Sequence, residues 1–175
     1  ISKIRGGQID VLTSIDNQWS PQINLGVSVL IPETYVADLD VRLGLYRRLS
    51  NLSKKVEFEG FAAELIDRFG KLPPEVNTLL LVVRIKSVCK KAGICKLDGG
   101  PKGATVQFHN DKFISPEGLV EFIKKQDGLA KVKDNKLIIK RDWKKNTDKF
   151  KGAFSIARDL AEIAASYEKN AAAKN

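Results

Sequence analysis

Three charged residues, Glu64, Asp67 and Arg68, are the first candidates for chemistry in this sequence. At 100° per residue they fall together on one side of a helix. Two nearby carboxylates could serve general acid–base catalysis, but an acidic pair beside an arginine is more typical of recognition. The simplest interpretation is a solvated face with a Glu64–Arg68 ion pair worth roughly 0.2–0.5 kcal/mol, and most charged helix faces are of that kind. The alternative is a charged contact patch that binds a partner.

Other patterns of catalytic or ligand-binding residues are absent from the sequence. It has no phosphate-binding GxxxxGK[ST] loop, no GxSxG motif and no paired-histidine metal motif. The glycine-rich run 99–103 lies between two predicted strands and is interpreted as a turn, because a phosphate cradle needs a helix terminus. Cys89 and Cys95 lack CxxC spacing and are predicted to be buried free thiols. We therefore predict no catalytic residues, no metal and no cofactor in this chain.

The helix that carries the three charges is defined by its apolar stripe and by its end. Gly70 can close the helix, and the prolines that follow prevent its continuation. Pro74 and Glu75 suit the first turn of a second helix, which is predicted to run to about Ala92. The stripe consists of apolar residues at i, i+3 and i+4 spacing, namely Phe58, Phe61, Ala62, Leu65, Ile66 and Phe69.

The charge of the chain is basic and uneven. The 175 residues carry a formal net charge of +9, and residues 131–151 hold nine Lys or Arg against three Asp. Such a patch can meet phosphates or an acidic protein surface. The candidate contacts are Lys140, Arg141, Lys144 and Lys145. The region contains no recognisable nucleic-acid-binding motif, so its basic charge is only a weak signal for nucleic-acid binding.

Composition predicts a cytoplasmic globular protein with no membrane partner. The chain is 43% hydrophobic and 29% charged, and no apolar run approaches the roughly 20 residues of a membrane span. We find no secretory signal, and free thiols suit a reducing compartment. The absence of methionine, even at position 1, indicates a fragment or a processed chain.

The order of elements predicts an α+β fold: a single compact domain with about five helices and a mixed or antiparallel sheet of about five strands. We expect residues 1–22 to connect to an upstream domain, residues 23–168 to form the α+β domain, and residues 169–175 to fray. Asp38 or Asp40 should cap a helix that exposes Arg42, Arg47 and Arg48. The remaining predicted elements are strands at 23–30, 94–97, 104–109, 129–133 and 136–140, and helices at 115–126 and 148–167.

Two motifs resemble the C-terminal domain of transcription-repair coupling factors, a family of bacterial DNA translocases. One is ELIDRFGKLPPEV, which contains the three charged residues, and the other is IPETYVADLDVRLGLY, which begins at Ile31. They stand in the order of the family pattern, and the resemblance runs from about Val27 to Trp143. Ala37 departs from the pattern, which often has proline there, so we expect a slightly looser turn.

The resemblance implies a non-catalytic regulatory domain. Such a domain packs on the N-terminal UvrB-like module of the same protein, masks its UvrA-binding surface and restrains the translocase. Glu64, Asp67 and Arg68 would face that module. The parent would use ATP and Mg²⁺ upstream of this chain, and would meet UvrA, RNA polymerase and DNA. The alternative function is a basic accessory domain that binds nucleic acid through residues 131–151.

Overall fold

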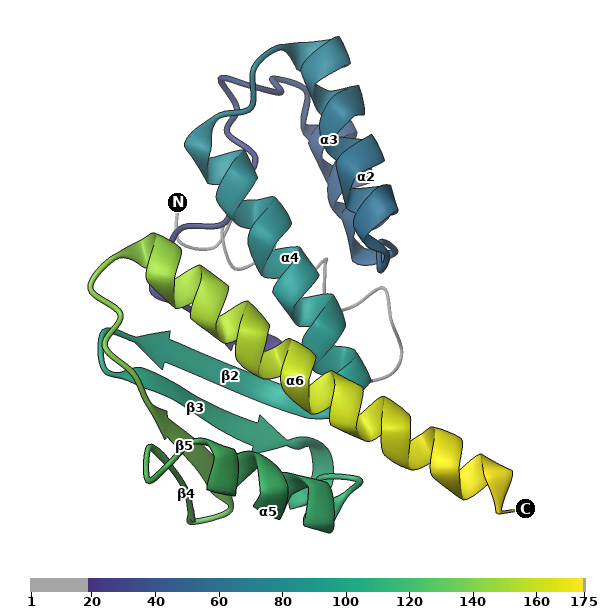
Figure 1. Ribbon diagram of the computed structural model, residues 1–175. Coiled ribbons are helices and arrows are strands. Elements are labelled where there is room, and N and C mark those ends of the chain that lie inside the picture. Colours follow the sequence, from purple (N-terminus) through teal and green to yellow (C-terminus); the bar gives the residue numbers. More distant parts are fainter. Residues whose placement is uncertain (1–18, 175) are drawn as a thin grey trace. The chain divides into compact units, whose positions relative to one another are not determined.

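The computed structural model describes residues 19–174, which contain five α-helices and one five-stranded sheet (Figure 1). The sheet combines one parallel strand pair with three antiparallel pairs. This architecture confirms the predicted α+β class with a mixed sheet. The predicted connecting segment 1–22 lies outside the described residues, except for its last four positions. No helix among the described residues is long and apolar enough to cross a membrane.

Within this α+β domain the chain forms two compact units. The described part of the first, here called the helical unit, comprises residues 19–20 and 27–87. The second, here called the sheet unit, comprises residues 21–26 and 88–174. The boundary between Ser87 and Val88 falls inside helix α4 (Pro74–Ala92). Each unit is described below by itself.

The helical unit consists of α2 (Leu39–Ser50), α3 (Lys55–Phe69) and most of α4. As predicted, Asp38 caps α2, and its carboxylate accepts a hydrogen bond of 2.9 Å from the Val41 amide. The core of the unit is formed by buried apolar side chains of the three helices and of the preceding loop, namely Ile31, Val36, Leu45, Tyr46, Leu49, Phe58, Phe61, Leu65, Val76, Leu79 and Val83.

Two expectations about side chains of the helical unit were wrong. Ile66 is 49% exposed, because the buried stripe of α3 is narrow and Ile66 lies about 100° beyond Leu65 on the helix. Arg42 is only 4% exposed, although its place on α2 suggested a solvated face. The loop before α2 covers Arg42, and two carbonyl groups of that loop accept hydrogen bonds from the guanidinium.

The sheet unit contains strands in the order β1-β2-β3-β5-β4. Their bounds are β1 (Gln22–Asn24), β2 (Ile94–Gly100), β3 (Gly103–Phe108), β4 (Ala130–Lys133) and β5 (Lys136–Lys140). β1 is shorter than the predicted strand 23–30, since Gly26 has a φ of +68° and leaves the extended region. β2 is longer than predicted and pairs through Gly100. The β4–β5 hairpin is as predicted, with Asp134 and Asn135 at positive φ in its turn.

One face of this sheet is packed and carries Leu97, Ala104, Val106, Leu137 and Ile139, all buried. Figure 1 shows α6 (Asn146–Ala173) running along β2 and α5 (Pro116–Lys125) beside β4. The predicted helix start is confirmed, since Ser115 is the N-cap of α5 and its hydroxyl accepts a hydrogen bond of 3.1 Å from the Gly118 amide.

The last helix of the sheet unit, α6, continues to Ala173, past the predicted end at Tyr167. Its N-terminal part packs against the buried Trp143 ring. A Cβ atom added at Gly152 would lie 2.3 Å from Cζ2 of that ring, so only glycine allows this approach. The η1 turn (His109–Asp111) joins β3 to the segment before α5.

Candidate partner-binding site on the helical unit

The site is built on a loop, residues 31–37, that precedes α2. Its first amide, on Ile31, donates a hydrogen bond of 2.7 Å to the hydroxyl oxygen of Tyr46. At its other end the Nη1 atom of Arg42 donates to the carbonyls of Val36 and Ala37, at 2.7 and 2.9 Å. The Ile31–Tyr46 and Arg42–Val36 bonds are buried and the Arg42–Ala37 bond is half-buried. Together they fix the conformation of the loop.

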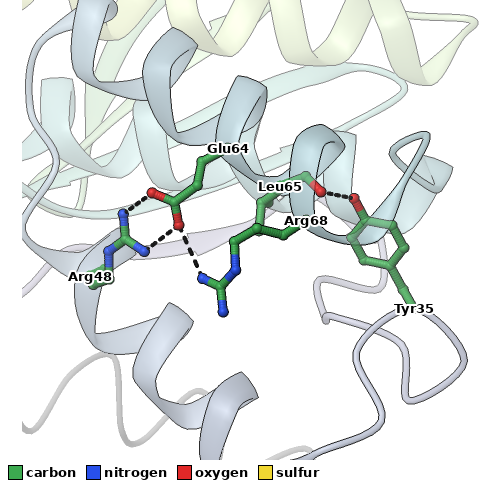
Figure 2. A network of polar contacts seen from close by, with 5 residues as sticks. All are labelled: Tyr35, Arg48, Glu64, Leu65 and Arg68. Atoms are coloured by element: carbon green, nitrogen blue, oxygen red, sulfur yellow. Dashed lines mark hydrogen bonds and ion pairs between the residues drawn. The ribbon is translucent and has the colours of Figure 1, made fainter.

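Tyr35, in the middle of this loop, reaches the end of α3. Its hydroxyl group lies 2.7 Å from the Gly70 carbonyl oxygen and 3.0 Å from that of Leu65, and it donates its proton to this pair of acceptors. Figure 2 shows the tyrosine pointing at the helix backbone. The Tyr35 and Phe69 rings also contact, with centroids 5.7 Å apart. The loop motif and the helix motif of the family resemblance therefore form one connected structure.

The charged residues of α3 form an ion-pair cluster with α2 (Figure 2). The two carboxylate oxygens of Glu64 accept hydrogen bonds from both terminal nitrogens of Arg48, at 2.6 and 2.7 Å. Arg68 donates to the same carboxylate at 3.1 Å. We call Arg48, Glu64 and Arg68 the arginine–glutamate cluster. Two-point contacts of this kind fix direction as well as distance.

The cluster strongly favours the charged form of Glu64. Hydrogen bonding from Arg48, followed by that from Arg68, lowers the pKa of Glu64 from 4.5 to about 2. The side chains nevertheless remain between a third and a half exposed. Solvent screening therefore limits each pair to roughly 0.2–1 kcal/mol of stability.

Both arginines of the cluster also lie over aromatic rings. The guanidinium carbon of Arg48 is 5.1 Å from the centroid of the Phe61 ring, and that of Arg68 is 4.8 Å from the centroid of Phe69. These cation–π contacts add to the hydrogen bonds in fixing the guanidinium groups. The cluster is thus held by both α2 and α3.

Of the three predicted site residues, the structure brings Glu64 and Arg68 together and leaves Asp67 beside them. The Asp67 side chain is exposed, and no ion pair recorded among the described residues involves it. Sequence reasoning missed Arg48, which lies sixteen positions before its partner Glu64. The only available signal was a basic residue in the last turn of α2.

The four basic candidates have different surroundings. Lys140 is the last residue of β5. The Arg141 guanidinium donates hydrogen bonds to the Lys140 carbonyl and to the side-chain oxygen of Gln126. Lys144 lies 3.8 Å from Asp142 in a short loop, and Lys145 is the residue before α6. Adjacent positions in the sequence therefore point to different surroundings.

The remaining reactive groups of the described residues are dispersed. Residues 19–174 contain no group of three or more His, Cys, Asp or Glu side chains placed to hold a metal ion. Both cysteines are free, as predicted, but only Cys89 is buried and Cys95 is half-buried. Burial raises the pKa of the Cys89 thiol to about 12. That thiol is held in its unreactive protonated form.

Comparison with known proteins identifies the family. Residues 25–119 match the family model of the TRCF domain, more than half of this chain. The transcription-repair-coupling factor of Rickettsia conorii is 47% identical over 119 residues, which cover 67% of this chain and 10% of that protein. The corresponding factor of Escherichia coli K12 is 31% identical over 126 residues, covering 72% of this chain and 11% of that protein.

The chain thus spans about a tenth of the length of these curated relatives. Its fold resembles the crystal structure of the C-terminal domain of a transcription-repair coupling factor, with a TM-score of 0.70 and 22% identity. That match covers 87% of this chain and 98% of the solved one. The resemblance seen in the two sequence motifs is confirmed: the chain belongs to the TRCF domain family and has the fold of the C-terminal domain of a transcription-repair coupling factor.

Proposed function

We propose that this domain regulates its parent protein by docking reversibly on the parent's N-terminal UvrB-like module. In the docked state it covers the surface that binds UvrA and restrains the DNA translocase. The parent works in the cytoplasm on DNA and stalled RNA polymerase, and its ATP and Mg²⁺ act outside this chain. The observation that carries the proposal is the exposed arginine–glutamate cluster with Asp67 beside it.

The chemistry of this surface suits a reversible protein contact. Each guanidinium has five N–H donors, and Glu64 takes only two from Arg48 and one from Arg68. The remaining donors and the exposed Asp67 carboxylate present both signs of charge. Complementary charges at the rim of an interface set its register and still allow release.

The three predicted residues then have different roles. Glu64 is a positioning residue, because both of its carboxylate oxygens are occupied by arginines of the same unit. Arg48, Arg68 and Asp67 are the groups that contact the partner. Charge reversal at Asp67 should therefore disturb docking without disturbing the cluster.

A regulatory contact of this kind must be weak enough to open. A ligand can shift the equilibrium from the docked to the released state only by the difference in its affinity for the two states. A docking contact stronger than a few kcal/mol would therefore stay closed. Exposed charged pairs supply energies in this range. Tethering in one chain supplies the effective concentration that a weak contact needs.

The test uses the full-length parent with Asp67→Lys, and measures UvrA binding and the ATPase rate. We expect both to rise by at least about fivefold, the lower end of typical coupling between sites. Glu168→Lys, the same charge change on an exposed residue of α6, is the matched control and should leave both values unchanged. Arg68→Glu is a second test of the contact surface.

If Asp67→Lys and Arg68→Glu parents are folded and yet bind UvrA and hydrolyse ATP like the unmodified parent, the proposal is wrong. A rise that occurs equally in the Glu168→Lys control would also contradict it. That outcome would indicate a general effect of charge rather than a docking surface.

A further inference from the structure

The β-sheet of the sheet unit places several lysines on one of its two faces. Strand residues alternate between the two faces, so pairing register defines each face. Lys136 is paired with Gln107, which is paired with Lys96, and Lys133 is paired with Lys136. Lys131 and Lys140 share this face by alternation. We call Lys96, Lys131, Lys133, Lys136 and Lys140 the lysine face.

The lysine face is the side of the sheet opposite the packed core. All five lysines are exposed, whereas the residues that alternate with them on β3 and β5 are buried. The other side chains on this face are mostly small or amide groups, including Gln22, Asn24, Thr105 and Gln107. Asp98 is the single acidic residue in these rows, and it pairs with Lys96 at 3.8 Å.

Four lysines of this face have no recorded anionic partner among residues 19–174: Lys131, Lys133, Lys136 and Lys140. Lys133 and Lys136 are directly opposite each other in the hairpin. Like charges in that position destabilise a sheet. A bound polyanion would remove the repulsion, so the arrangement favours a ligand with closely spaced negative charges.

We propose that the lysine face binds the sugar–phosphate backbone of nucleic acid, independently of the docking surface on the helical unit. From β4 to β2 the face spans three strand spacings, about 14 Å, and Lys136 to Lys140 spans a similar length along β5. Duplex DNA carries one charge per about 1.7 Å of axis, so on the order of eight phosphates lie within that distance.

The composition of the face favours nucleic acid over a protein partner. The centres of protein interfaces are depleted of lysine and enriched in aromatic residues, and this face has no aromatic residue in its paired rows. Interfaces with DNA are more polar and much more positively charged. Because the contacts are to phosphates, binding should be independent of base sequence.

This assignment differs from the site indicated by sequence position. The loop residues Lys144 and Lys145 leave the sheet before α6, and Lys149 is buried. Lys96, which lies outside the basic segment, joins the face through the pairing of β2 with β3. The candidate surface is therefore formed by lysines of β2, β4 and β5, and not by the continuous basic segment 131–151.

The test is titration of the 175-residue chain with a fluorescent duplex DNA at 50 and 200 mM salt. With about four phosphate contacts the slope of log K against log salt should be about −3.6, which is a loss of roughly 100-fold between these concentrations. The double variant Lys131→Glu/Lys133→Glu should lose at least about tenfold in affinity and reduce the slope by about 2.

The matched control is Lys144→Glu/Lys145→Glu, which changes the net charge equally and should keep most of the affinity. Lys133→Glu should also raise the melting temperature, since it places opposite charges across the hairpin. Reduced DNA binding with an unchanged or higher melting temperature separates loss of the surface from loss of the fold. If the Lys131→Glu/Lys133→Glu variant does not fold, the Lys131→Gln/Lys133→Gln variant replaces it in the titration.

Equal losses in the two double variants would overturn the proposal, because net charge rather than the lysine face would then govern binding. Binding of polyglutamate or of phosphatidylserine vesicles as tightly as duplex DNA would overturn it as well. No measurable DNA binding at 50 mM salt would have the same consequence. A loss confined to the lysine-face variants supports it.

Discussion

The Tyr35 hydroxyl group donates to the Gly70 carbonyl oxygen across 2.7 Å and so joins the loop before α2 to the end of α3. Gly70 has a φ of +92°, and its carbonyl is not used by the helix. Tyr35→Phe removes the hydroxyl group, so the Gly70 and Leu65 carbonyls lose the hydrogen bond that it donates. We expect the free energy of unfolding to fall by about 0.5–1.5 kcal/mol. Urea unfolding measures it, with the exposed Tyr167→Phe as the control, and equal changes in both variants would contradict the assigned role.

Glu64 should give the chain a stability component that disappears in acid. Its folded pKa is lowered to about 2 from 4.5, so the stabilisation is present above about pH 4.5 and is lost as pH falls toward 2. Glu64→Gln should lower the free energy of unfolding by about 0.5–1 kcal/mol at pH 7. The difference from the unmodified chain should shrink as pH falls from 4.5 toward 2. A difference that is constant with pH would show that the carboxylate charge is not responsible, and Glu168→Gln provides the baseline.

Arg42 should be essential in a way that its sequence neighbours are not. Its guanidinium bridges the Val36 and Ala37 carbonyls from a buried position. Both bonds come from Nη1, while Nη2 lies 3.6 Å from the Glu33 carboxylate. A lysine has a single terminal nitrogen and cannot occupy both places. Arg42→Lys should therefore cost about 1–3 kcal/mol of stability, whereas Arg47→Lys on the exposed side of α2 should cost less than about 0.5 kcal/mol. Thermal unfolding of both variants checks this, and similar melting temperatures would refute it.

Glycine-to-alanine substitutions should have opposite signs in two helices. Gly60, inside α3, has no atom within 4 Å of an added Cβ, so Gly60→Ala should stabilise by about 0.5–1 kcal/mol. Gly152→Ala in α6 pushes a methyl group into the Trp143 ring and should destabilise by about 1–3 kcal/mol.

A double-mutant cycle isolates the steric cause at Gly152. In a Trp143→Leu background the added methyl group has room, so the penalty of Gly152→Ala should become smaller. Denaturant unfolding of the four proteins measures the coupling energy. A penalty that stays the same with leucine at position 143 would mean that the tryptophan ring is not its source.

Local sequence signals predicted most of the elements, because the relevant interactions lie within a few residues. The Asp38 cap, the end of α3 at Gly70 and the hairpin turn at Asp134 each depend on neighbouring positions. The contact of Arg48 with Glu64 is different, since it requires α2 and α3 to be packed first. Burial of Arg42 likewise depends on the conformation of the loop before α2, which cannot be predicted from the periodicity of the helix. The sequence therefore predicted that charged residues of α3 lie together, but it did not predict that Arg48 of α2 joins them.

The pairing of β1 with β2 is parallel, and the main part of the helical unit, residues 27–87, lies between these two strands in the sequence. Topologically, that unit is the crossover connection of a single, very large β–α–β element. Closing a loop of roughly 70 residues costs on the order of 4 kcal/mol of chain entropy. β1 should accordingly be the last strand to join during folding, after the β2–β3 hairpin. Pulsed hydrogen exchange would show this as later protection of the amides that bond β1 to β2, and simultaneous protection would exclude it.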